Sequence, residues 1–435
     1  MSADRLTADL FTALCEFPLI DPHSHIEPLH PVSKSLDDIL GYHYYTELAH
    51  SAGMSQGPLG KDVPPRERVR AILGHMDRFD NAVQYSWFLE IARTFLGFEG
   101  DRLTAADADS LFDRAERVFA QPDWERQVIA KTKLEKIFLT NEFDDALEGF
   151  DTQTYVPCLR TDTLVFQLGL ATVRERLAKT TGVEVGDQAT LKQAITKLFE
   201  RFVGKGAKAC AISLPPDFEP RPITQSHPRA TEAFLSLLRA NELRPDCSAG
   251  RDCLYQVTTS GIFWMLAECC REFQLPFDLM IGVNRKVYEK GVYQGQDLFD
   301  QRTSLIQYRE LFNAFPAVTF PVSVLTSGQN QELVAYAWIF PNVVTSGHWW
   351  YSNIPAYIAA DLRERLQAVP KTKQVGYYSD AYKLEFVLPK YNMYRRVLAG
   401  VLAEDFVKPG MLSESRALEL GRRLLRDNVR ALFRV

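Results

Sequence analysis

The 435-residue sequence predicts an α/β protein, a (β/α)8 TIM-type barrel with a helical insertion after its first strand. Three observations favour this fold: eight short β-prone runs, helix-patterned segments in most of the gaps between them, and polar residues where the runs end. Alternating strands and helices are typical of a parallel sheet, and a barrel carries its chemistry at the carboxyl ends of its strands. A doubly wound open sheet is the alternative, but no glycine-rich phosphate loop follows the first strand.

The composition is that of a globular protein, with 46% hydrophobic and 24% charged residues. A net charge of −5 leaves no basic surplus to neutralise phosphates, which argues against a nucleic-acid partner. The chain has no apolar run of about 18 residues, and its first residues include acids where a signal peptide has a basic start. We therefore expect no membrane partner and a cytoplasmic protein. The seven cysteines form no C-x-x-C pair, so we expect reduced thiols.

The first strand carries two histidines. Residues 3–16 have the apolar spacing of an amphipathic helix, and the strand-like run Leu19–Ile26 follows with His23 and His25. Residues i and i+2 of a strand point to the same side, so both imidazoles could reach one metal ion. The motif also occurs by chance, and a catalytic metal site needs about three protein ligands. The hypothesis therefore depends on finding a third ligand.

Residues 35–133 are helical in pattern, with almost no β-branched runs. A segment of this length is too long for a loop between two barrel elements. We expect it to form a cap beside the first strand, within a single barrel domain that spans residues 1–435.

The other seven strands are predicted at 136–140, 155–160, 209–214, 277–283, 318–325, 343–348 and 374–380. Helices are predicted between them at 164–179, 191–204, 258–273 and 352–369, and residues 391–435 form a helical tail that closes the outer ring. The proline-bearing stretch 214–227 is expected to be an irregular loop, either a plain surface loop or a lid.

Polar residues end most of the predicted strands. They are His23 and His25, Thr140 with Asn141 and Glu142, Arg160 with Asp162, Ser213, Asn284 with Arg285, Thr326 with Ser327, His348, and Asp380. Asp380 ends the last strand, which lies beside the first strand in a closed barrel. Its carboxylate could complete a His₂Asp set of ligands with His23 and His25. The sequence therefore predicts a mononuclear metal site at the carboxyl-terminal face.

Six segments together resemble the uronate (glucuronate) isomerases, a family of the amidohydrolase superfamily. The segments are Asp21–His25, Leu40–Tyr45, Leu139–Glu148, Val156–Asp162, Ser346–Tyr351 and Val375–Asp380. They occur in the family's order, and the resemblance runs nearly end to end. It implies a divergent member of the family, with a barrel of the metal-dependent hydrolase kind.

The resemblance also implies an activity, the interconversion of a hexuronate aldose and its ketose, such as D-glucuronate and D-fructuronate. It implies one divalent metal ion, with zinc expected, held by His23, His25 and Asp380. Asp380 would serve as both ligand and base, with His43 and Tyr44 as further catalytic residues. Arg160 suits the carboxylate of a sugar-acid substrate because it can grip it bidentately. A structural ion pair with Asp162 is the other interpretation of Arg160.

Further residues are expected to contact the substrate or to shape its pocket. Trp349 and Trp350 match the family's tryptophan pair, and His348 stands where the family has a small residue. An imidazole hydrogen-bonded in the barrel mouth is the other interpretation of His348, and simple packing is the other interpretation of His43 and Tyr44.

Two positions depart from the family's pattern. Tyr382 occupies the place of an arginine that pairs with the catalytic tyrosine, and Met280 occupies the place of a histidine. Neither side chain can replace the lost donors and charge. A metal-dependent hydrolase that acts on a lactone, ester or amide of a sugar acid is therefore kept as an alternative, as is a paralogue that binds a sugar acid without turnover. The oligomeric state is left open, a homo-oligomer included.

Overall fold

The computed structural model describes residues 3–222, 230–239 and 254–435. Every pairing between its strands is parallel. The strands are β1 (Leu19–Asp21), β2 (Leu134–Phe138), β3 (Tyr155–Val156), β4 (Cys158–Arg160), β5 (Ala209–Leu214), β6 (Phe277–Ile281), β7 (Phe320–Val324), β8 (Val343–Ser346) and β9 (Gln374–Val375).

The third barrel strand is divided into β3 and β4 at Pro157, whose missing N–H cannot take part in a ladder. The division leaves one sheet in the order β1-β2-β3 and another in the order β4-β5-β6-β7-β8-β9. The Asn141 N–H donates to the Cys158 carbonyl and the Arg160 N–H to the Asn141 carbonyl, both at 2.9 Å, which joins the two sheets. At the other seam the Asp380 N–H donates to the His23 carbonyl at 3.2 Å. These bonds close the ring, and the predicted α/β barrel is confirmed.

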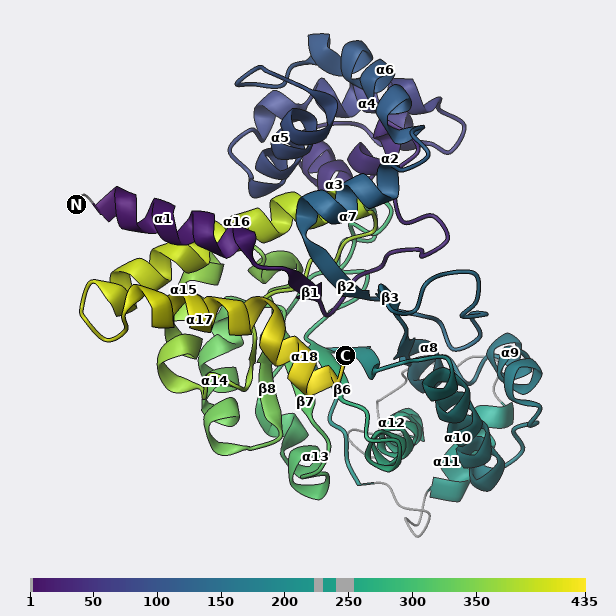
Figure 1. The fold of residues 1–435 in the computed structure, drawn as a ribbon. Coiled ribbons are helices and arrows are strands. Elements are labelled where there is room, and N and C mark those ends of the chain that lie inside the picture. The colour runs from purple at the N-terminus through teal and green to yellow at the C-terminus, as the bar shows by residue number, and fades with distance from the viewer. Residues whose placement is uncertain (1–2, 223–229, 240–253) are drawn as a thin grey trace.

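Helices surround the strands (Figure 1). They are α1 (Ala3–Glu16), α8 (Asp162–Phe166), α9 (Ala171–Thr181), α10 (Gln188–Gly204), α11 (Ala230–Arg239), α12 (Leu254–Glu272), α13 (Arg309–Ala314), α14 (Asn330–Ile339), α15 (Pro355–Ala368), α16 (Val387–Leu402), α17 (Glu414–Arg422) and α18 (Asn428–Phe433). The helix expected at 164–179 is two helices, α8 and α9. None of the helices among the described residues is long and apolar enough to cross a membrane.

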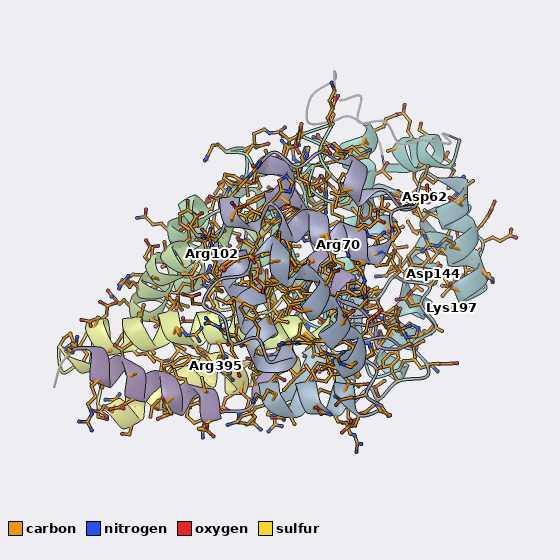
Figure 2. The ribbon with its side chains drawn as sticks, turned by 90° about the horizontal axis from the view of Figure 1, so that it is seen from above. Asp62, Arg70, Arg102, Asp144, Lys197 and Arg395 are labelled. Carbon is orange, nitrogen blue, oxygen red and sulfur yellow. The ribbon has the colours of Figure 1, made fainter. Side chains whose placement is uncertain are left out.

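Residues 36–132 form helices above the strands in Figure 1; most of them make up the group at the top, and the last one lies lower, beside α16. These are α2 (Leu36–Leu40), α3 (His43–Ser51), α4 (Pro65–Leu73), α5 (Val83–Leu96), α6 (Ala108–Phe119) and α7 (Trp124–Thr132). Viewed from above, this group, with Arg70 and Arg102, lies nearest the viewer (Figure 2). We call residues 36–132 the cap; its status as an insertion within one barrel domain stays a prediction.

A buried carboxylate joins the cap to the barrel. Glu385, which follows β9, accepts hydrogen bonds from the Ser33 N–H at 2.9 Å and from the Trp124 indole N–H of α7 at 2.8 Å. Burial raises the pKa of Glu385 above its ordinary value, although the two donors act in the opposite direction. The loop after the last strand is thereby tied to both ends of the cap.

Three strands end before the candidate site residues that the sequence placed at their ends. β1 ends at Asp21, so His23 and His25 lie in the segment beyond the strand, and β8 ends at Ser346, before His348. β9 has only two residues, Gln374 and Val375, and Asp380 lies beyond it. At each of these places the backbone leaves the ladder to carry side chains to the barrel mouth. Of the loop predicted at 214–227, residues 223–227 lie outside the described residues.

Candidate active site

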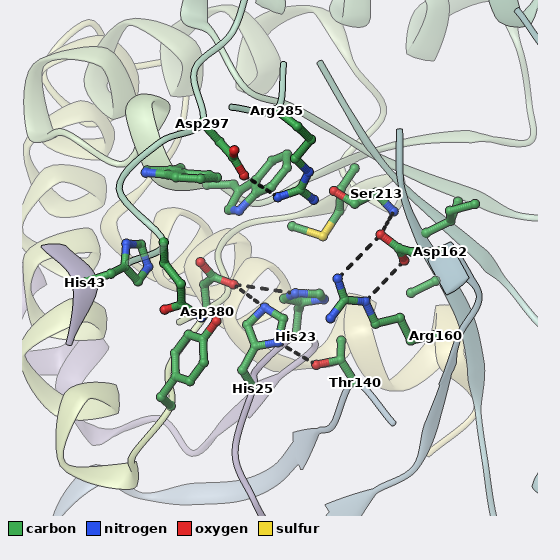
Figure 3. A pocket seen from close by; sticks show the side chains of 17 residues that line it. His23, His25, His43, Thr140, Arg160, Asp162, Ser213, Arg285, Asp297 and Asp380 are labelled. Carbon is green, nitrogen blue, oxygen red and sulfur yellow. Dashed lines mark hydrogen bonds and ion pairs between the residues drawn. The ribbon is translucent and has the colours of Figure 1, made fainter. Parts of the chain in front are cut away.

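A cavity of about 200 Å³ opens at the carboxyl ends of the strands, beneath the cap. Figure 3 shows the side chains that line it. They come from seven strand ends and from the cap: His23, His25, His43, Thr140, Arg160, Asp162, Ala211, Ile212, Ser213, Met280, Arg285, Gln294, Asp297, Trp349, Trp350, Asp380 and Tyr382.

His23, His25 and Asp380 converge at the floor of this cavity (Figure 3). The Asp380 Oδ1 atom lies 3.3 Å from His25 Nε2 and 3.6 Å from His23 Nε2, and the ligand atoms of all three residues lie within 4.8 Å of one another. Two of these atoms, His23 Nε2 and Asp380 Oδ1, are buried and have no hydrogen-bond partner. Buried polar atoms are normally satisfied, and two imidazole nitrogens with one carboxylate oxygen suit a divalent ion of the zinc type. The three residues therefore fit a metal ion.

A hydrogen bond orients the His25 imidazole, and a buried acid lies behind the His23 ring. The Thr140 hydroxyl donates to the Ser24 carbonyl at 2.8 Å, so its oxygen is free to accept from His25 Nδ1, also at 2.8 Å. A proton on Nδ1 leaves the lone pair of His25 Nε2 for a metal. Behind His23, the Asp278 Oδ2 atom lies 3.9 Å from Nδ1, and burial raises the pKa of that carboxyl to about 7.

The ionisation states also suit metal binding. Burial, with a further contribution from His25, lowers the pKa of His23 to about 3, so the ring is neutral at physiological pH. Burial would raise the pKa of Asp380, but the neighbouring imidazoles, His25 before His23, lower it to about 2. A neutral imidazole and an ionised carboxylate are the forms that bind metals.

Two ion pairs form the opposite wall of the cavity (Figure 3). Arg160 Nε lies 3.2 Å from Asp162 Oδ2, and the Ser213 N–H donates to Asp162 Oδ1 at 3.3 Å. Arg285 pairs with Asp297 at 2.6 Å. The carboxylates offset the positive charge of the two arginines. Guanidinium N–H groups that the ion pairs leave unused can still donate to an anion.

His43 enters the cavity from the cap. Its Nδ1 lies 2.7 Å from Glu47 Oε1, one helical turn further along α3, which holds the ring with Nε2 available. Figure 3 places His43 across the metal-ligand cluster from Arg160. An imidazole held by a carboxylate beside bound substrate is a common arrangement for proton transfer.

Tyr44 does not line the cavity. It lies behind His43, with a distance of 4.2 Å between ring centroids, and it is 3% exposed. Burial raises the pKa of its hydroxyl well above the ordinary value. A phenol with such a pKa is a poor acid–base group at neutral pH, so a direct role of Tyr44 stays a prediction beside the other interpretation, packing.

The predicted aromatic residues do lie at the cavity. Trp349 and Trp350 are part of its lining, and Tyr382 stacks on His25 with 4.9 Å between ring centroids and 27° between planes. Burial, followed by the charge of Asp380, raises the pKa of Tyr382 to about 12, so its hydroxyl stays protonated. Tyr382 can therefore donate a hydrogen bond but cannot supply the charge of an arginine.

His348 lies outside the cavity lining. Its fully buried ring points toward α15, with Nδ1 3.4 Å from Asp361 Oδ2. The cause is Gly347, which has a φ of 35° and turns the chain directly after β8. That His348 contacts substrate stays a prediction; the contact that the structure gives its ring is the one with Asp361.

Sequence reasoning missed three kinds of residue. Gln294 and Asp297 belong to the segment after β6, whose Gly-rich and polar sequence has no periodic pattern. Arg285 was noted only as a polar strand end, although the arginine directly after β6 could have been weighed with Arg160 as an anion ligand. Asp278 lies inside an apolar run that predicts a strand, and that buried acid was the available signal.

A parallel barrel with a buried His-His-Asp cluster at its mouth, beside a wall of ion pairs, defines a barrel enzyme with a candidate divalent-metal centre. The chain belongs to the glucuronate isomerase family, whose profile matches residues 1–433, and this family is part of the amidohydrolase superfamily. The predicted membership is confirmed.

Individual relatives agree over their whole lengths. The uronate isomerase of Corynebacterium efficiens is 23% identical over 476 residues, covering 100% of this chain and 97% of that protein. The crystal structure of uronate isomerase from Thermotoga maritima has a TM-score of 0.87 at 20% identity, covering 99% of this chain and 97% of that one. The crystal structure of glucuronate isomerase from Caulobacter crescentus has a TM-score of 0.88 at 19% identity, with 100% and 94% covered. At this identity the structural likeness shows the shared fold.

Proposed function

We propose that the protein isomerises a hexuronate or a closely related sugar acid between its aldose and ketose forms, of the D-glucuronate to D-fructuronate type. The observation that carries this proposal is the buried His23, His25 and Asp380 cluster at a cavity whose far wall holds Arg160 and Arg285. Membership of the glucuronate isomerase family supports the isomerase and not the hydrolase alternative.

His23, His25 and Asp380 would hold one divalent ion, for which zinc is the expected metal because the donor set has two imidazoles and one carboxylate. When bound, the ion would polarise the carbonyl and hydroxyl oxygens at C1 and C2 of the sugar.

Arg160 is proposed to bind the substrate carboxylate. Its Nε and Nη2 atoms face Asp162 at 3.2 and 3.5 Å, a loose contact that leaves the Nη1 donors for an anion. Charge-assisted hydrogen bonds of this kind are stronger than neutral ones. A carboxylate on Arg160 would place the other end of the sugar toward His43, on the far side of the metal ligands (Figure 3).

The remaining groups would move protons. The C2–H bond breaks and a C1–H bond forms, while one proton passes from the C2 oxygen to the C1 oxygen, so that substrate and product are isomers. Asp380 is ionised and would take the proton from C2 and return it to C1. His43, held by Glu47, would carry the proton between the two oxygens. Tyr382 and the two tryptophans would exclude water and orient the sugar.

Solvent deuterium tests the proposal. The metal-loaded protein is incubated with D-glucuronate in D₂O, and the recovered sugar acids are examined by NMR. We expect D-fructuronate with deuterium at C1, and exchange at C2 of the recovered aldose, both lost in Asp380→Asn. Release of acid from a sugar-acid lactone or ester, with no conversion of hexuronate, would support the hydrolase and refute the isomerase.

A small-molecule sugar acid is the substrate in this proposal and also the binding partner that we expect. The cytoplasmic location and a homo-oligomeric state stay predictions.

A further inference from the structure

A buried lysine lies directly behind the candidate metal centre. Lys390, in the first turn of α16, is 0% exposed. Its ammonium group donates to the Ser379 backbone carbonyl at 2.8 Å and to the Tyr42 hydroxyl oxygen at 3.1 Å. A fully buried lysine is rare because its charged ammonium group loses its hydration, which costs free energy. This position therefore needs a strong local reason.

Aromatic rings of the cap surround the same ammonium group. The Lys390 Nζ atom lies 4.9 Å from the ring centroids of Tyr42 and Trp87 and 5.2 Å from that of Tyr44. Ring faces attract cations at such distances, and more strongly when water is excluded. Tyr42 directly precedes α3, Tyr44 lies in α3, and Trp87 lies in α5. The lysine is thus held by the cap on one side and by the end of the last barrel strand on the other.

The segment that Lys390 contacts carries the metal-ligating carboxylate. Asp380 has a φ of 52°, in the left-handed region that non-glycine residues seldom adopt. Hydrogen bonds hold the backbone up to this residue: the Ser379 N–H donates to Asp21 Oδ1 at 3.0 Å, and the Asp380 N–H donates to the His23 carbonyl at 3.2 Å. The Tyr42 hydroxyl donates to the Asp380 carbonyl at 2.8 Å. An unfavourable backbone conformation persists only when its surroundings fix it in this way.

A chain of donors therefore runs from the lysine to the ligand. The ammonium group donates to the Tyr42 oxygen, and the Tyr42 hydroxyl donates onward to the Asp380 carbonyl. A charged donor polarises the hydroxyl that accepts from it and strengthens the next bond in the chain. The direct bond to the Ser379 carbonyl fixes the peptide immediately before Asp380.

We propose that Lys390 is a positioning residue for the metal centre: directly and through Tyr42, it holds the Ser379–Asp380 backbone so that the Asp380 carboxylate faces His23 and His25. Tyr42 and the surrounding rings belong to the cap. The same contacts therefore make the geometry of the metal centre depend on how the cap packs against the barrel. The inference rests on the metal site of the proposed function, and not on which sugar is turned over.

A second lysine provides a matched control. Lys373 donates two hydrogen bonds to backbone carbonyls, those of Ala337 and Phe340, both at 2.6 Å. It precedes β9, at the opposite end of that strand from Asp380, and its bonds join it to α14 and the residue after it. Removing Lys373 costs two bonds of the same kind without touching the ligand segment.

The experiment measures the affinity for Co²⁺ of five full-length proteins by the visible absorption of the bound ion. They are wild type, Lys390→Met, Tyr42→Phe, the double variant that combines these two changes, and Lys373→Met. Loss of a residue that orients a metal ligand typically weakens binding about 10- to 100-fold. We expect that loss for Lys390→Met, a loss of about tenfold for Tyr42→Phe by the same reasoning, and an affinity within about twofold of wild type for Lys373→Met. The double variant should bind about as weakly as Lys390→Met alone, because the two changes break one chain.

The outcomes separate this inference from the proposed function. If folded Lys390→Met binds Co²⁺ within twofold of wild type, or if wild type binds none, Lys390 is not a positioning residue. If Lys390→Met does not fold, Tyr42→Phe decides, because it keeps the ring and loses only the hydroxyl. An equal loss in Lys373→Met would show a general effect of instability and would also overturn the inference. A wild type that binds Co²⁺ but moves no deuterium would refute the isomerase alone.

Discussion

Two buried histidine–aspartate clusters lie at the carboxyl ends of strands in the same barrel, and only one of them reaches the cavity. In the first, His23 and His25 face Asp380; in the second, His348 faces Asp361. Both contain neutral imidazoles, since burial and neighbouring positive charge lower the pKa of His348 to about 4 and that of His23 to about 3. Residue type and burial therefore do not distinguish a candidate metal centre from a structural pair.

The difference lies in the number of ligand atoms and in access to the cavity. Asp361 accepts from the Ser327 hydroxyl and belongs to α15, on the outside of the strands. Its Oδ2 atom and both His348 nitrogens are buried without a hydrogen-bond partner among the described residues, as are Asp380 Oδ1 and His23 Nε2, so an unsatisfied atom does not by itself mark a metal centre. Around Asp380 two imidazoles converge at the cavity, whereas Asp361 faces one imidazole away from it.

Backbone direction at the strand end separates the two clusters. Gly347 has positive φ, and a Cβ atom there would overlap the Tyr378 ring, so only glycine allows the turn that sends His348 outward. At β1 the chain continues from Asp21 past the seam with the last strand, and His23 and His25 stay at the mouth. Predictions on each cluster test this contrast.

The largest effect is expected from Asp380→Asn. The amide removes both the base and the anionic metal ligand, so kcat for hexuronate isomerisation should fall by about 10³-fold or more, the range of general base catalysis. Steady-state kinetics at saturating metal measure it, with circular dichroism to show an intact fold. Turnover near the wild-type rate would remove Asp380 from the mechanism.

Metal removal should affect one cluster and not the other. A saturating divalent ion at 100 times its Kd stabilises a folded protein by about 2.7 kcal/mol, and a chelator reverses this. Thermal unfolding with zinc and with chelator should therefore differ for wild type and for His348→Gln. For His23→Ala the two curves should coincide; a metal-dependent shift that persists in His23→Ala would place the ion elsewhere.

His43→Gln should lower kcat by about 10²-fold with a small change in KM, because a positioned acid–base group contributes to the transition state more than to binding. Glu47 should be tested beside it, since Glu47→Gln keeps the hydrogen bond to Nδ1 and removes the charge. The expected order of kcat is wild type, Glu47→Gln, His43→Gln. A rise in KM alone would assign His43 to binding.

The smallest effect on activity is expected from His348→Gln, within about threefold of wild type if its role is structural. Its effect should appear in acid stability. The unfolded chain binds a proton at the ordinary histidine pKa near 6.5, whereas the folded ring does so only near pH 4, so protonation favours unfolding between these values. Wild type should lose up to about 3 kcal/mol over that window, following from the size of the shift.

Urea unfolding at pH 7.5 and pH 4.5 measures the loss. His348→Gln cannot titrate, so its stability should fall less over the same interval. An equal fall in both proteins would show that His348 is not the group responsible, and a large loss of kcat would return it to the active site.

The sequence was sufficient to bring the three candidate metal ligands together because each was tied to a strand end. The H-x-H spacing and a terminal aspartate, placed on neighbouring strands by a closed barrel, predict their convergence without further information. Arg160, Trp349, Trp350 and Tyr382 also follow strand ends, and the structure brings them to the cavity. Tyr44 and His348 are not among the residues that line the cavity, because adjacent residues on a helix, or beyond a glycine turn, face different directions.

Periodicity and strand-end position, read from the chain alone, predicted the barrel, a helical segment at 35–133 and the three candidate metal ligands. Only the tertiary structure decided which buried groups are paired and which are left open, because pairing depends on residues far apart in the sequence. Lys390 shows the reason most clearly: its partners, Tyr42 and Ser379, are 348 and 11 residues away. No local sequence pattern in α16 distinguishes Lys390 from a solvent-exposed lysine. Its burial follows only from the packing of the cap and the last strand around it.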